Sequence, residues 1–543
     1  GHHTIRQSQR AAGRQVSCRR DTPRLAVYHP FMPPGIRSAQ LMIGMEIHVE
    51  LATRSKMFTR VANVAHPSNF DAPPNSLVDP VVAALPGALP VMNKSAIEMS
   101  IMVGLALNCE IAKFSKWDRK NYFYPDLPKG YQISQYDLPL CFDGELDIHG
   151  SDGSLKQIGI IRAHLEEDTG KLGHELPGGH HYDGSLVDLN RAGTPLLEIV
   201  TEPDLTGADD AVIFAQELRN ICRFLGVTEG IMQRGHMRFE PNVNVIIFTD
   251  DGHRFATPIV EVKNLNSFKA LHGAIDFEYK RQIEQWKKDG QVQGPGMKST
   301  RGWDDPRSMT VLQREKEDAH DYRYFPDPDL VPVTVSDAWK AEIAARVPEL
   351  PMRRRKRYLD DYGLSEKDAI TLTDDRDICL FYEACIEAVH DLKNSQAPTS
   401  HAGRECAKWL LNAGAKRANE RGVAIHELGI TPRQDAQIID LRIRNVIGSN
   451  AADELFALLC DPRKSDVDAE ALAREHGLVQ VTDTHQLDAW IDEAIKAQPQ
   501  AAQDFAAGKD AAAGRLVGQV MKASKGQADA ATVQARLRKK LRA

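Results

Sequence analysis

Apolar and polar residues alternate along residues 41–51, which read LMIGMEIHVEL. Because successive side chains of a strand point to opposite faces, this run predicts a strand with one apolar face. Its other face carries Glu46, His48 and Glu50. Similar runs, separated by Gly, Pro, Asp and Asn turns, occur at residues 130–136, 157–165, 195–201, 242–248 and 258–263.

Helical spacing of apolar residues, at i, i+3 and i+4, appears between these strands at residues 94–108, 209–225 and 267–288. Residues 41–335 therefore predict an α+β domain built on antiparallel strands. Beyond Pro332 the pattern is helical, with one block at residues 336–428 and a second, Ala-rich block at residues 429–543. We expect these three domains to follow an extension formed by residues 1–40.

That extension carries seven arginines and no lysine, and Asp21 is its single acidic residue. Arg-rich, acid-poor composition is typical of a transit peptide or of a disordered extension, and the poor amphipathic periodicity here favours the extension. The whole chain has 543 residues, a net charge of −7 and eight cysteines without a CxxC pair, which suits reduced thiols in a globular protein. No run approaches the roughly 20 apolar residues of a membrane span, so we expect no membrane contact.

Several common catalytic devices are absent from the sequence, among them a Walker A loop, a GxGxxG turn after a strand, GxSxG and HExxH. Acidic residues instead recur on predicted strands. Glu46 and His48 share one face, residues 162–168 end a second strand, and Glu198 and Glu202 come from a third. Carboxylates that converge on a sheet face suit Mg²⁺, a hard ion that prefers oxygen ligands. A solvated polar sheet face has the same pattern, so both interpretations stay open.

Basic and aromatic side chains are interleaved in residues 117–135, which include Lys120 and Tyr122. This mixture suits phosphate contact with stacking on an adenine or on tRNA bases, although a Tyr-rich turn on the core has the same composition. The end of the chain is also basic. There Lys522 and Lys525 either contact RNA phosphates or belong to a solvated helix end.

Long motifs in a fixed order carry a resemblance to a known family. They read IGMEIHVEL at 43–51, DRKNYFYPDLPKGYQISQ at 118–135, HLEEDTGKL at 164–172, VDLNRAGTPLLEIVTEPD at 187–204, HDYRYFPDPDLVPV at 320–333 and GRLVGQVMKASKGQA at 514–528. In this order they resemble the B subunit of tRNA-dependent amidotransferases, the GatB family, from about residue 41 to the end. The last motif is similar to YqeY-type helical domains.

The resemblance implies a carbon–nitrogen ligase component that uses ATP and Mg²⁺ in a kinase-like cradle domain. Such a protein transfers the γ-phosphate of ATP to the side-chain carboxylate of Glu or Asp carried by tRNA(Gln) or tRNA(Asn), and ammonia then gives the amide. The implied partners are the amidase, or A, subunit, which supplies ammonia, and the small C subunit, in a heterotrimer. The helical domains would hold the tRNA. The implied compartment is the cytoplasm, with the mitochondrial matrix as the alternative.

Matched motif by motif, the resemblance implies that four residues bind Mg²⁺: Glu46, His48, Glu167 and Glu198. The implied contacts to ATP are Lys120, Tyr122 and Arg191, and the implied catalytic residues are Glu46, Lys120 and Glu167. Strict alternation instead places Glu166 on the face of His164, so Glu166 is the alternative ligand unless a bulge occurs there.

Two positions depart from the family's pattern, because Phe239 stands where the family has cysteine and Glu240 where it has aspartate. Two other functions remain to be weighed. One is a tRNA-binding scaffold without catalysis, against which the four metal-ligand candidates argue. The other is a free-standing carboxylate–amine ligase for a small metabolite, against which the long helical, basic-ended C-terminal half argues.

Overall fold

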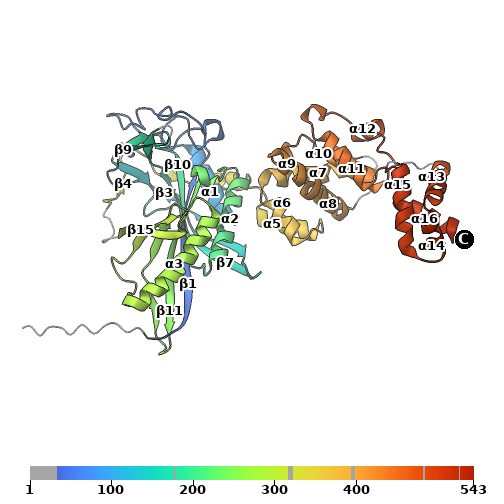
Figure 1. Ribbon diagram of the computed structural model, residues 1–543. Helices are drawn as coiled ribbons and strands as arrows, with labels where there is room; N and C mark the ends of the chain where they lie inside the picture. The colour runs from blue at the N-terminus through green and yellow to red at the C-terminus, as the bar shows by residue number, and fades with distance from the viewer. Residues whose placement is uncertain are drawn as a thin grey trace, which may run out of the picture.

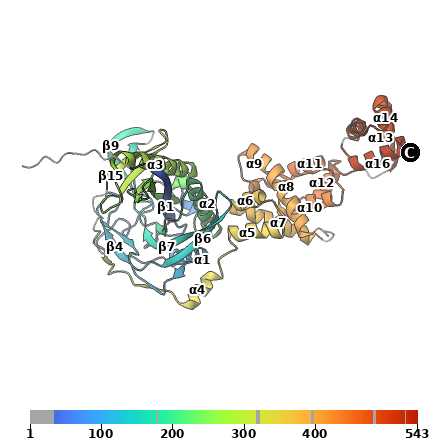
Figure 2. The same cartoon turned by 90° about the horizontal axis from the view of Figure 1, so that it is seen from below.

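The computed structural model describes residues 34–176, 179–315, 322–392, 398–480, 484–524 and 526–542. Three lobes follow one another along the molecule, a sheet domain, a helical lobe and a small C-terminal bundle that ends far from the sheet (Figures 1 and 2). Each lobe has its own cluster of buried apolar side chains. The α+β class that the sequence predicts is therefore confirmed.

Thirteen of the described strands form one sheet, with the central order β15-β14-β13-β11-β1-β10-β7-β5-β4-β16. Along that order they are β15 (Met309–Glu315), β14 (Ser299–Asp304), β13 (Val260–Lys263), β11 (Met237–Thr249), β1 (Ile36–Glu50), β10 (Pro195–Thr201), β7 (Leu155–Glu167), β5 (Tyr131–Ser134), β4 (Asp118–Asn121) and β16 (Phe325–Pro326). Off this path lie β2 (Glu110–Ile111), β6 (Cys141–His149) and β12 (Arg254–Ala256). Separate two-stranded sheets join β3 (Phe114–Ser115) to β17 (Val333–Thr334) and β8 (Lys171–Leu176) to β9 (His180–Asp188).

The sheet is built mainly on antiparallel strands, as the sequence predicts, and one pair, β13 and β14, runs parallel. The helix α3 (Phe268–Asp289) connects these two strands, and such a crossover returns the chain in the same direction. Ser267 caps the start of α3 by accepting the amide of Ala270 at 3.1 Å, and Gly290, with φ of 64°, ends it.

One face of the sheet is covered by helices and the other is polar. The apolar residues of β1, such as Ile43 and Ile47, are fully buried in a core shared with α1 (Lys94–Ala106), α2 (Ala208–Phe224) and α3. Alternation in β1 leaves Glu46, His48 and Glu50 on the opposite face. The amphipathic patterns of the sequence therefore predicted both the helices and the polar face.

Three domain boundaries differ from those predicted. Strand β1 begins at Ile36, inside the predicted extension, whose first 33 residues lie outside the described part of the chain. The helix α4 (Asp337–Ala344) belongs to the sheet domain, because Ile343 is buried in that core. The second core includes both Leu428 and Ile430, so the predicted boundary at residue 429 does not separate two domains.

The helical lobe contains α5 (Pro351–Asp360), α6 (Glu366–Thr373), α7 (Arg376–Asp391), α8 (Thr399–Lys408), α9 (Ala415–Arg421), α10 (Pro432–Ile443), α11 (Ser449–Leu459) and α12 (Ala469–Glu475). The C-terminal bundle contains α13 (Thr484–Ala497), α14 (Pro499–Ala506), α15 (Ala513–Ala523) and α16 (Ala530–Leu541). None of the described helices combines the length and apolarity needed to cross a membrane.

Helix α2 joins the sheet domain to the helical lobe. Its last residue, Phe224, is buried in the second core, and the Arg354 guanidinium lies 5.5 Å from the centre of that ring. Glu217 of α2 pairs with Arg355 at 2.7 Å, so an apolar contact and an ion pair hold the two lobes together.

Candidate active site

A row of polar side chains crosses the four central strands of the sheet. The register pairs His48 of β1 with Glu198 of β10 on one side and with Arg238 of β11 on the other, and Glu198 pairs with His164 of β7. Glu46 lies on the same face as His48, two residues earlier in β1. Residues that are far apart in sequence thus meet because their strands are adjacent.

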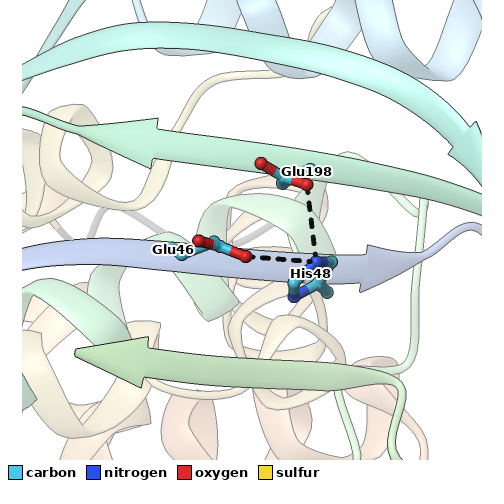
Figure 3. Close-up of side chains that lie close together, drawn as sticks. All are labelled: Glu46, His48 and Glu198. Carbon is cyan, nitrogen blue, oxygen red and sulfur yellow. Dashed lines mark ion pairs between the residues drawn. The ribbon is translucent and has the colours of Figure 1, made fainter. Parts of the chain in front are cut away.

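Two carboxylates flank the His48 ring, as Figure 3 shows. Nε2 of His48 lies 3.8 Å from Glu46 and 3.6 Å from Glu198. The His164 ring approaches Glu198 from the next strand, with Nε2 3.7 Å from the carboxylate. The structure therefore brings together Glu46, His48 and Glu198, three of the four predicted metal ligands.

Among the described residues, three overlapping groups place their ligand atoms within 4.8 Å of one another. They are Glu46 with His48 and Glu198, His164 with Glu166 and Glu198, and Glu46 with Glu240 and Glu261. Because they share Glu46 and Glu198, they form one continuous set, which we call the ligand band: Glu46, His48, His164, Glu166, Glu198, Glu240 and Glu261. Five carboxylates and two imidazoles give a donor set suited to a divalent cation.

The titration behaviour of the ligand band reflects burial first and the neighbouring charges second. Burial and the neighbouring Glu198 raise the pKa of Glu46, and burial raises the pKa of Glu166 to about 7. Burial opposes a charge on His48, but the contact with Glu198 prevails and raises the pKa of that imidazole to about 9. Burial lowers the pKa of His164 to about 4. A bound cation would relieve the repulsion between these carboxylates.

Glu167 does not join the ligand band. It points to the opposite side of β7, where it pairs with Lys129 and accepts the amide of Ile133 at 3.1 Å. Strand β7 runs through Glu166 and Glu167 without a bulge, in register with Leu196 and Pro195 of β10. The choice of Glu167 over Glu166 therefore disagrees with the geometry, and strict alternation was the better guide.

Lys120 approaches the ligand band from β4. Its ammonium lies 5.2 Å from the ring centre of Tyr322, and although burial opposes its charge, Glu166 raises the pKa of the amine above its ordinary value. Tyr122 donates to the amide oxygen of Gln132 at 3.2 Å. Together with Tyr322, it gives the cationic side of the ligand band an aromatic rim.

Comparison with known protein families finds two matches along the chain. Residues 41–341 match the family described as the GatB/GatE catalytic domain, and residues 393–541 match the family described as the GatB domain. The chain belongs to the GatB family.

Proteins named as the B subunit of aspartyl/glutamyl-tRNA(Asn/Gln) amidotransferase are similar to this chain over nearly its whole length. The relative from Caldicellulosiruptor bescii is 42% identical over 505 residues, which cover 92% of this chain and 99% of the relative. The relative from Thermomicrobium roseum is 43% identical over 492 residues, covering 91% and 96%. The relative from Geotalea uraniireducens is 43% identical over 503 residues, covering 92% and 99%.

A second cluster in this GatB-family chain lies next to the ligand band and includes Arg191. Its guanidinium donates to the carbonyls of Thr169 at 3.1 Å and Gly170 at 2.7 Å, so much of its donor capacity is used within the chain. Asp168 lies 3.6 Å from Arg191 and accepts from Arg238 at 2.9 Å. These two arginines oppose the effect of burial and hold the pKa of Asp168 below its ordinary value.

Sequence reasoning noted Glu50, His164, Asp168 and Glu240 without assigning them a role in this site, and it did not offer Arg238 and Glu261 as partners. For Arg238 and Glu240 a signal existed, because residues 237–249 continue the alternation beyond the predicted strand. Glu202, which the sequence offered as a candidate, is exposed just beyond the end of β10 and outside the ligand band.

The predicted tRNA contacts in the C-terminal bundle have a mixed outcome. Lys522 is exposed in the last turn of α15, whereas Lys525 lies outside the described residues. Several cations of α16 are paired within the bundle, including Arg536 with Asp488 at 2.8 Å and Lys540 with Asp492 at 2.5 Å. Lys522 therefore stays a prediction, and much of the basic charge of α16 is locally balanced.

Proposed function

We propose that this chain is the B subunit of a tRNA-dependent amidotransferase. It phosphorylates the side-chain carboxylate of Glu-tRNA(Gln), Asp-tRNA(Asn) or both with ATP, and ammonia from a partner amidase then forms the amide. One observation carries the proposal: a member of this family holds the ligand band on the polar face of its sheet, with Lys120 beside it. The names of its relatives include both aspartyl and glutamyl substrates.

The residues that would hold Mg²⁺ are Glu46, His48, Glu166 and Glu198, with His164 beside them. The buried Nδ1 atoms of His48 and His164 have no partner among the described residues, and Nε2 of each ring faces carboxylates. Bound Mg²⁺ supplies charge neutralisation for the triphosphate. The carboxylate-rich donor set fits this hard ion.

The chain's own residues would position the two reacting anions. Lys120 binds the terminal phosphate, and Tyr122 with Tyr322 borders the nucleotide. An oxygen of the substrate carboxylate attacks the γ-phosphorus, the bond to the β-phosphate oxygen breaks, and ADP leaves. Ammonia then attacks the acyl carbon and inorganic phosphate leaves, so catalysis here consists of positioning and charge balance.

The partners in this proposal are the amidase, or A, subunit and the small C subunit. The helical lobe and the C-terminal bundle hold the tRNA, with Lys522 as one contact. The buried free thiols, such as Cys222 and Cys385, suit the reducing cytoplasm.

The test is to isolate the chain with its amidase partner and to measure ADP release with each mischarged tRNA. We expect ADP only when a mischarged tRNA is present, and we expect Glu166→Gln to abolish it. Glu202→Gln, which removes an exposed carboxylate outside the ligand band, is the matched control. Equal activity of Glu166→Gln and the wild type would leave a tRNA-binding scaffold as the better description.

A further inference from the structure

Arg238 comes from β11 and Lys120 from β4, and the strands that carry Glu46, His48, Glu166 and Glu198 lie between these two strands. The path from β4 to β11 crosses β5, β7, β10 and β1, which is five strand spacings of about 4.8 Å, or about 24 Å between the outer backbones. The carboxylates of Glu166 and Glu198 act on Lys120, while Glu50 and Asp168 act on Arg238. The two cationic side chains thus come from strands in different parts of the sheet.

Arg238 is braced in a way that leaves part of its guanidinium available. Its Nη1 donates to Asp168 at 2.9 Å and lies 3.4 Å from Glu50. Within the described parts of the chain, no group accepts a hydrogen bond from its Nε or Nη2 atoms, and its side chain is 27% exposed. Asp168 is itself fixed by the backbone amide of Thr169 at 2.8 Å and by Arg191, so the guanidinium is held on a rigid support.

Two other cations, Lys263 and Arg162, pair directly with carboxylates of the ligand band. Lys263 pairs with Glu240 and lies 3.1 Å from Glu261, so it balances carboxylates of the band itself. Arg162 lies 3.8 Å from Glu198, and its side chain is more than a third exposed. Arg238 alone in this set is fixed by carboxylates outside the ligand band and keeps unused donors beside His48.

We propose that Arg238 binds the side-chain carboxylate of the aminoacyl group, the acceptor in the reaction proposed above, while Lys120 binds the phosphate donor. This inference rests on the proposed function. The planar fork of an arginine fits both oxygens of a carboxylate, whereas a lysine offers a single point charge to phosphate. Asp168 is then a positioning residue that aims the fork. Recognition of the acceptor thus comes from β11, whereas the phosphate donor is bound from β4.

The first test compares binding of uncharged tRNA with binding of tRNA carrying a stable, amide-linked glutamyl group, using the assembled amidotransferase without ATP. Arg238→Gln should weaken binding of the glutamylated tRNA about tenfold or more and change binding of the uncharged tRNA less than about twofold, because only the carboxylate contact is lost. Arg234→Gln is the matched control, since Arg234 lies four residues away and pairs with Asp71 at 3.1 Å, outside the ligand band. An equal loss with both tRNAs would overturn the proposal.

The second test separates the acceptor from ATP by kinetics. Arg238→Lys keeps the charge and can keep the contact to Asp168, yet lacks the fork. It should raise KM for the mischarged tRNA while KM for ATP stays within about twofold. Asp168→Asn should give the same pattern more weakly. A larger rise of KM for ATP would assign Arg238 to the nucleotide and refute the proposal.

The two proposals fail separately. Absence of ADP release by the wild-type assembly removes the proposed reaction, whereas the binding comparison needs no ATP. If the wild type prefers glutamylated tRNA and Arg238→Gln keeps that preference, the inference is wrong even when the reaction is confirmed. Thermal unfolding of each variant shows whether the buried cluster stays folded.

Discussion

The carboxyl group of Asp435 in α10 provides a sharp test of electrostatics inside the helical lobe. Asp435 is fully buried, and no N–H or O–H group within the described part of the chain donates a hydrogen bond to either of its oxygens. Burial raises its pKa to about 7 from an ordinary value of 3.8, opposed by the Cys385 thiol. The folded lobe therefore keeps this group protonated at pH values where the unfolded chain has ionised it.

Because the folded state binds the proton more tightly, the free energy of unfolding falls as pH rises from about 4 to about 7. The interval between 3.8 and about 7, at about 1.36 kcal/mol per pH unit, corresponds to about 4 kcal/mol. Most of this loss, about 3 kcal/mol, accumulates between pH 5 and pH 8. Asp435→Asn has no proton to lose, so its stability relative to the wild type should rise by that amount over the same interval.

Hydrogen exchange of peptides from α7 and α10 reports opening of this lobe without interference from the other two. The comparison between pH 5 and pH 8 isolates titration, because the fit of the new amide does not change with pH. Asp440→Asn is the control: it removes a carboxylate from the same helix, but one that pairs with Arg444 at 2.8 Å. A gap between Asp435→Asn and the wild type that is the same at both pH values would refute the reasoning.

Three further outcomes are expected. Glu166→Gln should weaken Mn²⁺ binding about tenfold or more, measured by paramagnetic resonance of free Mn²⁺, whereas Glu167→Gln should change it little; the opposite order would return Glu167 to the metal site. In metal-free protein, Glu198→Gln should lower the pKa of His48 from about 9 to its ordinary value of 6.5 or below, because burial remains while the stabilising carboxylate is lost. Nitrogen NMR of the imidazole measures this pKa. An unchanged pKa would contradict the role of Glu198 in keeping His48 charged. Deleting residues 484–543, which contain the whole third core, should weaken tRNA binding at least tenfold in a filter-binding assay and leave the melting temperature of the sheet domain unchanged. Unaltered tRNA affinity would show that the C-terminal bundle does not bind the tRNA.

The local alternation of apolar and polar residues was sufficient to predict much of the sheet domain. The alternation in residues 41–51 correctly placed Glu46 and His48 on one face, and the same rule identified Glu166 where motif matching favoured Glu167. Both results depend only on the period of two in a strand.

The alternation along the chain could not predict which strands become neighbours in the sheet. The pairing of β1 with β11 brings Arg238 beside His48, although the two residues are almost 200 positions apart. The parallel pair β13–β14 follows from the path of α3 rather than from either strand. The predicted boundary at residue 429 failed for a similar reason, because α10 packs on α7 and extends one core across it.

Helix α2 has a mechanical consequence, since its first turns are buried with the sheet and its last residue, Phe224, lies in the next lobe. The ion pair of Glu217 with Arg355 and that of Arg223 with Asp375 at 2.8 Å brace the same end. These contacts hold the helical lobe in a more fixed orientation to the sheet domain than a flexible linker alone would. A force on the outer helices is therefore transmitted to α2, which packs against the sheet that carries the ligand band.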